Sequence, residues 1–179
     1  ALHSQIATHA PYGGVFPNLA KREHAKNLVP LLKEVLSQPG TQQGETLLGV
    51  NEFRKPLLGT IEKMLEREPE LFEALEEFLR THGRPEIDAI AVTHGPGLEP
   101  CLWVGVNFAK ALSLVWDIPI VAVNHLEGHI TMAAMNIDIT GLRNPYIGTG
   151  SGVMHVFEFP ALALLISGGH TELDLMPRW

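Results

Sequence analysis

Two histidines one helical turn apart are the strongest candidates for metal binding in the sequence. His125 and His129 stand at positions i and i+4 of the segment that follows the apolar run 118–124. On a helix this spacing places both imidazoles on one face, where they can reach the same ion. Asn124 occupies the position of a helix N-cap. Two ligands do not complete the coordination shell of a metal, so a third is needed, and two ordinary surface histidines remain the alternative.

The same segment invites comparison with metalloproteases, whose H-E-x-x-H motif carries a general base directly after the first histidine. Here the carboxylate belongs to Glu127, two residues from each histidine. At about 100° per residue, its side chain points roughly 160° away from both imidazoles. The spacing therefore argues against a protease, which we keep as an alternative hypothesis that depends on Glu127 acting as the base.

Two turns that contain glycine are candidates for phosphate binding. Ser167, Gly168 and Gly169 follow an apolar run, and adjacent glycines let backbone N–H groups approach a ligand closely. Gly95 and Gly97 follow another apolar run and open a helical stretch, whose first N–H groups attract anions. Plain tight turns are the alternative for both. No serine or cysteine has the sequence neighbours of a catalytic nucleophile, and we predict no catalytic side chain.

Three apolar runs must position these groups, and each is predicted to form a buried strand: 87–93, 118–124 and 161–167. Helical periodicity follows the first two runs, over 102–116 and 125–135. Alternating strands and helices predict βαβ units in a sheet that helices cover on both faces. Ligands of such sheets bind at the carboxyl ends of the strands, where the candidate groups stand.

The first half of the chain is predicted to be mainly helical. Apolar residues keep helical spacing over 19–36 and over 60–80, where Pro69 kinks or splits the segment and the opposite face is rich in glutamate. Residues 137–158 are expected to form loops or a hairpin. Three further side chains are predicted to be buried, namely Trp103, Trp116 and the thiol of Cys101.

The composition is that of a globular chain with a sizeable core. The 179 residues are 45% hydrophobic and 18% charged, with a mean hydropathy of +0.10, which excludes a disordered chain. A single cysteine excludes an internal disulfide, and no apolar run reaches the roughly 18 residues of a membrane helix, so a reducing cytosolic compartment is expected. The net charge of −7 argues against a free-standing nucleic-acid-binding domain. Because the chain begins at Ala1 and ends at Trp179, just after an expected strand, we expect it to be part of a longer protein.

Four stretches, taken in this order, resemble the TsaD family of tRNA N6-adenosine threonylcarbamoyltransferases, formerly called glycoproteases or O-sialoglycoprotein endopeptidases. They are His9–Ala25, Ile87–Lys110, Ile120–Ile130 and Pro160–Leu173. The first stretch has the form that resembles the bacterial branch. The resemblance implies an α/β fold of the actin-like ATPase type, in which residues 1–179 form an incomplete first lobe, a mixed sheet flanked by helices. A helical insertion is expected over 37–86, and the second lobe is expected to lie outside this chain.

The resemblance also implies roles for the candidate residues. His125 and His129 would bind a divalent metal, iron(II) ahead of zinc, with a third ligand supplied by the second lobe. The site for threonylcarbamoyl-adenylate would be lined by Leu165, Ile166, Ser167, Gly168 and Gly169.

The implied reaction transfers the threonylcarbamoyl group from that adenylate to N6 of the adenosine beside the anticodon, in tRNAs that read codons starting with A. Implied partners besides this tRNA are a paralogous actin-like subunit and a small ATPase, and the implied location is the cytoplasm, away from membranes. A third hypothesis is a non-catalytic, truncated subunit that only forms an interface. For that interface we expect the helix over 19–36, and loss of association on placing charges at Leu28 and Leu32 would support it once unfolding of the core is excluded.

Overall fold

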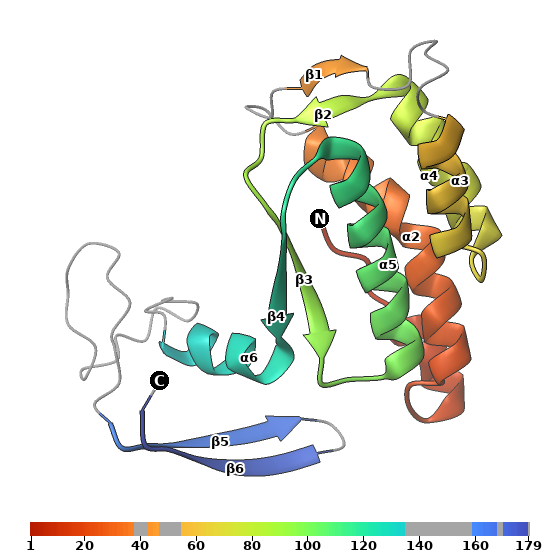
Figure 1. The fold of residues 1–179 in the computed structure, drawn as a ribbon. Coiled ribbons are helices and arrows are strands. Elements are labelled where there is room, and N and C mark those ends of the chain that lie inside the picture. Colours follow the sequence, from red (N-terminus) through yellow and green to blue (C-terminus); the bar gives the residue numbers. More distant parts are fainter. Residues whose placement is uncertain (38–42, 47–54, 135–158, 168–169, 179) are drawn as a thin grey trace. The chain divides into compact units, whose positions relative to one another are not determined.

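Helices dominate the first part of the chain in the computed structural model (Figure 1). The structure describes residues 1–37, 43–46, 55–134, 159–167 and 170–178. The chain divides into two units, Ala1–Val123 and Asn124–Trp179. None of the described helices is long and apolar enough to cross a membrane. In chain order the elements are α1 (Ile6–His9), η1 (Ala10–Tyr12), α2 (Pro17–Leu36), β1 (Gln43–Thr46), α3 (Lys55–Met64), α4 (Pro69–Thr81), β2 (Gly83–Pro85), β3 (Ile90–Gly95), α5 (Glu99–Trp116), β4 (Ile120–Asn124), α6 (His125–Ala134), β5 (Ala161–Ser167) and β6 (His170–Met176).

The helix predicted over 19–36 is confirmed as α2, which begins slightly earlier, at Pro17. Proline suits this first position because a backbone N–H there would have no partner within the helix. Along α2 the side chains of Ala20, Val29 and Leu36 are buried, as the amphipathic spacing predicts.

The segment predicted to be kinked or split at Pro69 forms two helices. α3 ends at Met64, and α4 begins with Pro69 as its first residue. Inside a helix the proline ring would clash with the carbonyl four residues earlier, so the chain starts a new helix here. In the sequence, the short strand β1 precedes the two helices and β2 follows them. These strands pair antiparallel, with Gln43 opposite Pro85. The described part of the segment 37–86, predicted to be a helical insertion, thus holds two helices and two short strands.

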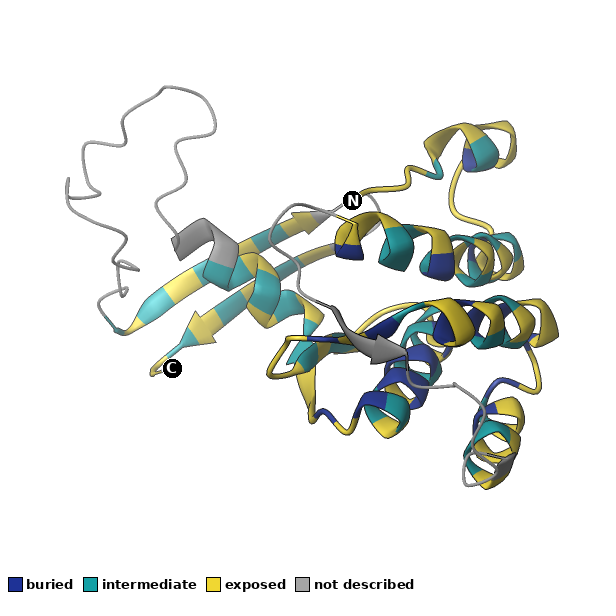
Figure 2. Ribbon diagram, turned by 90° about the horizontal axis from the view of Figure 1, so that it is seen from above, coloured by how far each residue is buried: buried dark blue, intermediate teal, exposed yellow. Residues whose placement is uncertain are grey.

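Four helices, α2 to α5, pack their apolar faces into one core. Ile61, Phe78 and Trp116 are each at most 2% exposed, and Figure 2 shows the buried residues gathered where these helices face one another. The prediction that Trp116 is buried is thus confirmed. Leu28 and Leu32 pack against the same core. Both are only partly buried there, so a charge placed at either position would disturb the core as well as any interface.

The strand–helix–strand unit predicted in the middle of the chain is confirmed. β3 and β4 form a two-stranded sheet, α5 connects them, and both strands run in the same direction (Figure 1). The backbone N–H of Ile90 donates to the carbonyl of Pro119 at 2.9 Å. Ile120 is 36% and Val121 is 49% exposed, and these neighbours point to opposite faces, so the described helices do not fully cover β4 on either face, contrary to the prediction. α5 packs on β3, and one helix can cover only one face of a sheet.

The third predicted strand is confirmed as β5, but it does not extend the sheet of β3 and β4. It pairs with β6 in an antiparallel hairpin, with Leu162 opposite Leu175. A connection of two residues can join only antiparallel neighbours, whereas a parallel strand needs a long crossover. Leu162 is 63% and Leu175 is 71% exposed, so the prediction that this strand is buried is wrong for one face. The segment 137–158, predicted as loops or a hairpin, lies outside the described residues.

A series of hydrogen bonds ties the N-terminal segment to α2. The backbone N–H of Phe16 donates to Nδ1 of His9 at 3.4 Å. Nε2 of His9 lies 3.1 Å from Oε1 of Gln5, and Nε2 of Gln5 lies 3.3 Å from Nδ1 of His24. Because His9 is only 7% exposed, these bonds supply the partners that a buried imidazole requires.

Replacing Phe78 by alanine should lower the free energy of unfolding by about 3–5 kcal/mol, because the lost ring leaves a cavity in the core. Leu114→Ala on α5 is the matched control, since Leu114 is 42% exposed and its loss should cost roughly 0.5 kcal/mol. Urea unfolding followed by circular dichroism measures both. Equal losses for the two variants would contradict the core described above.

Acid should weaken the fold through His24. Burial, and then the charge of a protonated His9, lower the pKa of His24 from its usual 6.5. At pH values between the lowered pKa of folded His24 and 6.5, the unfolded chain binds more protons than the folded chain. The contribution of His24 to the free energy of unfolding is therefore fully present above pH 6.5 and is lost as the pH drops through the folded pKa. Urea midpoints at about pH 7.5 and about pH 5 should therefore differ more for the wild type than for His24→Gln. Identical differences in the two chains would show that His24 is not the responsible group.

Candidate functional site

The start of α6 is fixed by a side-chain cap at the end of β4. Oδ1 of Asn124 accepts hydrogen bonds from the backbone N–H groups of Leu126 at 2.9 Å and Glu127 at 3.3 Å. These are the second and third residues of the helix, whose N–H groups have no partner within it. The predicted N-cap is confirmed, and it makes His125 the first residue of α6.

The two candidate metal ligands lie side by side on α6. Nε2 of His125 and Nε2 of His129 are 3.2 Å apart, and the two rings meet edge to face with an interplanar angle of 78°. Both residues are exposed. Two nitrogens that each lie about 2.1 Å from one ion at 90–109° are about 3.0–3.4 Å apart, so the spacing of the pair fits a shared metal. The prediction that both imidazoles occupy one helical face is confirmed.

The pair alone is not a complete metal site. Among the described residues no group of three histidine, cysteine, aspartate or glutamate side chains could hold an ion. Glu127 is exposed, and its carboxylate makes no hydrogen bond or ion pair within the described part of the chain. A general base would have to reach the water or substrate held at the pair. Among the described residues the histidine pair therefore has no third candidate ligand beside it, and no hydrogen bond or ion pair brings the Glu127 carboxylate to the pair.

The residues predicted for adenylate binding fall at the turn of the β5–β6 hairpin. Leu165 and Ile166 are neighbours on β5, so they point to opposite faces, and Ile166 is 73% exposed. Ser167 ends the strand opposite His170. Gly168 and Gly169 lie outside the described residues. The described part thus places Leu165–Ser167 at one strand end, with Leu165 and Ile166 on different faces.

The turn between β3 and α5 has the geometry that glycine favours. Gly95 and Gly97 have φ values of +152° and +158°, at the edge of the region that other residues rarely adopt. The carbonyl of Leu98 already accepts from the N–H of Leu102. Glu99 opens α5 and places a carboxylate in its first turn. That charge complements the helix dipole and would oppose a bound phosphate, so the strand-to-helix turn explains these glycines better.

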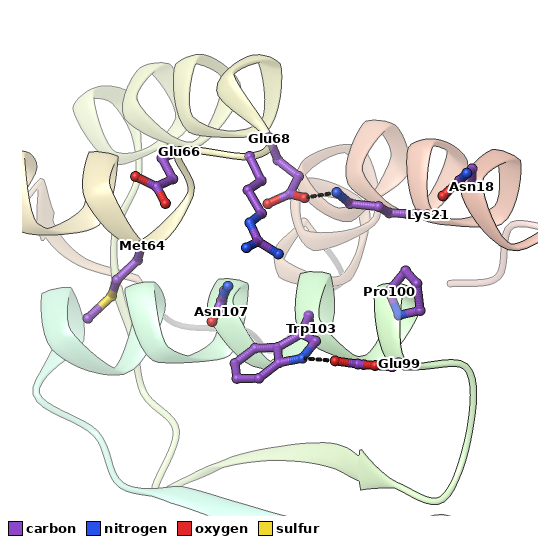
Figure 3. A pocket seen from close by; sticks show the side chains of 10 residues that line it. Asn18, Lys21, Met64, Glu66, Glu68, Glu99, Pro100, Trp103 and Asn107 are labelled. Carbon is purple, nitrogen blue, oxygen red and sulfur yellow. Dashed lines mark hydrogen bonds and ion pairs between the residues drawn. The ribbon is translucent and has the colours of Figure 1, made fainter.

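A cavity that the sequence did not indicate lies between α2, α5 and the connection from α3 to α4 (Figure 3). Its volume is about 510 Å³. Lys21 and Glu68 form an ion pair of 2.6 Å on its wall, and Glu68 is 8% exposed. The two residues are far apart in the sequence, which explains why no local pattern indicated the pair. Positive and negative side chains line the cavity together, so it does not select a charged ligand.

Trp103 lines the same cavity, and the prediction that it is buried is wrong. It is 50% exposed, and its Nε1–H donates to Oε1 of Glu99 at 3.3 Å (Figure 3). Nζ of Lys110 lies 5.7 Å from the ring centroid. The i, i+4 spacing of Glu99 and Trp103 is the sequence signal that could have identified a surface pair. Cys101 is only partly buried, and burial raises the pKa of its thiol.

Comparison with known proteins identifies relatives along almost the whole chain. The family model described as TsaD, tRNA N6-adenosine threonylcarbamoyltransferase, matches residues 1–46 and 68–177. A curated tRNA N6-adenosine threonylcarbamoyltransferase of Burkholderia cenocepacia is 36% identical over 173 residues, and one of Burkholderia lata is 37% identical over 173 residues. Each match covers 97% of this chain and 33% of the relative.

The chain therefore spans about a third of the length of the curated relatives it matches. Residues 47–67, which include α3, lie outside the family match. The matched residues contain the capped helix with its histidine pair and the β5–β6 hairpin. Since the match extends over well more than half of its residues, the chain belongs to the TsaD family of tRNA N6-adenosine threonylcarbamoyltransferases.

Proposed function

We propose that the protein containing this chain transfers a threonylcarbamoyl group from threonylcarbamoyl-adenylate to N6 of the adenosine beside the anticodon of tRNA. The tRNAs concerned read codons that start with A. Membership of the TsaD family supports this proposal, as do relatives that carry the name of this transferase. The observation that carries it within the chain is the pair of His125 and His129, held at the capped start of α6 inside the matched stretch.

For the metal we propose iron(II), with zinc as the second choice, held by His125 and His129. The 3.2 Å between their Nε2 atoms supports a shared ion, and neutral imidazole is a ligand that both metals accept. When bound, such an ion would act as a Lewis acid toward the carbonyl of the carbamoyl group. The chain's own contribution is orientation: Asn124 fixes the first turn of α6, and the helix then holds the two rings on one face.

For the adenylate we propose the end of β5 and the following turn, residues Leu165–Gly169. Two adjacent glycines between β5 and β6 allow backbone N–H groups to approach the phosphate of the departing AMP. The attacking group is N6 of the substrate adenosine, so no nucleophilic side chain of the protein is required. This agrees with Cys101, whose pKa is raised by burial and which therefore stays a thiol.

We further propose that residues 1–179 belong to the first lobe of an actin-like ATPase fold, with an insertion between 37 and 86. The unit formed by β3, α5 and β4 is compatible with such an α/β lobe, and residues 47–67 lie outside the family match. A paralogous actin-like subunit and a small ATPase are the proposed protein partners, and the cytoplasm is the proposed compartment. These last proposals rest on the family resemblance alone.

The histidine pair should bind metal measurably. We expect the chain to bind zinc or iron(II), and His125→Ala and His129→Ala each to weaken the affinity by roughly 10- to 100-fold or more, since each removes a ligand. His94→Ala is the matched control, because His94 is also exposed and lies near the end of β3. Isothermal titration at constant pH measures all four chains. Unchanged affinity in both ligand variants would contradict a metal site at α6.

The glycine turn should govern adenylate binding in the full-length protein. Gly168→Ala should weaken the affinity for threonylcarbamoyl-adenylate by about tenfold, because a methyl group keeps the phosphate away from the backbone N–H groups. Gly59→Ala on α3 is the control, since a Cβ there would meet nothing within 4 Å. Equilibrium binding of the adenylate measures both variants. Equal affinity in the two would place the adenylate elsewhere.

A further inference from the structure

We propose that a cavity at the start of α2 and α5 binds the uncharged base of the adenosine that is modified, with Nε2–H of His24 donating to a ring nitrogen of that base. We call this cavity the His24 pocket. Its volume is about 570 Å³. Its lining includes six residues from α2, α5 and the segments before them, namely Gln5, His9, Val15, His24, Leu98 and Cys101. The inference rests on the proposed function, which supplies adenosine as the acceptor.

The direction of each hydrogen bond around the pocket follows from a single fixed donor. The backbone N–H of Phe16 can only donate, so Nδ1 of His9, 3.4 Å away, is an acceptor and carries no proton. A neutral imidazole then carries its proton on Nε2, which donates to Oε1 of Gln5 at 3.1 Å. The amide nitrogen of Gln5 therefore faces Nδ1 of His24 at 3.3 Å and donates to it.

His24 is the last member of this series, and its second ring nitrogen takes no part in the series. Since Nδ1 accepts from Gln5, the neutral ring carries its proton on Nε2. Within the described part of the chain this Nε2–H has no hydrogen-bond acceptor. The exposed ring lines a mainly apolar cavity together with Gln5 and His9, so this N–H is available to a ligand that enters it. A ligand with a single well-placed acceptor in an apolar body would satisfy it.

The pocket favours an uncharged ligand. None of the residues that line it in the described part of the chain is a lysine, arginine, aspartate or glutamate. The pKa of His24 is lowered, and that of the Cys101 thiol is raised, so both groups stay neutral near pH 7. Bringing a phosphate or carboxylate into such surroundings would remove it from water without a compensating charge. The adenylate donor is thereby disfavoured, and the base of the acceptor nucleoside is the uncharged flat group that remains.

The location of the pocket agrees with a substrate site. Leu98 follows the carboxyl end of β3, and Cys101 lies in the first turn of α5. In α/β sheets, ligands bind at this end of the strands. Enzymes that modify a base take it out of its stack into an apolar pocket and recognise it by hydrogen bonds to its edge. Adenine offers ring nitrogens as acceptors, which complements the Nε2–H of His24.

The test titrates adenosine into the 179-residue chain and follows the His24 ring and the Val15 methyl groups by NMR. We expect saturable shifts with a dissociation constant of about 1 mM, and at least tenfold weaker binding of AMP, because the pocket offers its phosphate no cation. His24→Phe keeps a flat ring but loses the donor, and it should abolish the shifts. Val15→Trp should block the pocket mouth, because Val15 is 60% exposed and lines it.

Matched controls keep these variants interpretable. His94→Phe changes another exposed histidine, and Val35→Trp changes a residue on α2 that is 46% exposed and does not line the pocket. Both should bind adenosine as the wild type does. The proposal is overturned if adenosine causes no saturable shift at the pocket, if AMP binds there as tightly, or if His24→Phe or Val15→Trp still binds adenosine normally.

This outcome is separable from that of the proposed function, because the adenosine titration needs neither metal nor adenylate. The histidine pair could bind metal and the full-length protein could transfer the threonylcarbamoyl group while adenosine does not bind in the His24 pocket. In that case only the proposed binding of the base in this pocket fails. In the transfer assay, His24→Phe should raise KM for tRNA at least about tenfold with little change in kcat, since the contact would be made equally before and during transfer. A purely structural role would lower the amount of active protein instead.

Discussion

Everything in the first unit depends on the burial of α5. One side of this helix packs on β3, and its other neighbours are α2 and α3. Val104, Phe108 and Trp116 are almost fully buried along it. Burying such side chains is the main favourable term in folding, and close packing makes each position specific. The packing of α5 also dictates the turn before it, where Gly97 takes a φ of +158° so that the chain can pass from β3 into the helix.

The segment outside the family match is part of this core rather than an appendage to it. Ile61 on α3 is 1% exposed, and α3 packs on both α4 and α5. At the beginning of α4, the buried carboxylate of Glu68 pairs with Lys21 of α2 at 2.6 Å. A buried charge is costly unless it is paired, so this contact fixes which part of α2 the connection meets. Removing residues 47–67 would therefore uncover the part of the core that Ile61 fills.

The histidines of the chain serve two different arrangements. His125 and His129 are exposed, and their Nε2 atoms lie within hydrogen-bond distance of each other at 3.2 Å. His9 and His24 lie in a directed series of hydrogen bonds through Gln5, which sets the position of their protons. The proposed recognition of a tRNA base by an uncharged pocket would need no positive charge, which is compatible with a net charge of −7.

Local patterns in the sequence determined the helices and the capped start of α6. The spacing of apolar residues identified α2, α4 and α5, Pro69 identified the break, and Asn124 identified the N-cap, because each is a property of residues within a few positions of one another. The placement of His125 and His129 on one face followed from the same local geometry. The family resemblance likewise came from the order of short stretches.

Only the tertiary structure decided what those elements meet. The sequence did not reveal that β5 pairs with β6, that Leu28 packs against the core while Trp103 is exposed, or that Lys21 meets Glu68. Nor did it reveal that Gln5 joins His9 to His24 around a cavity. Burial and long-range pairing depend on which surfaces come together when the chain folds. The sequence of an apolar run does not show whether one face of the strand or both faces are covered.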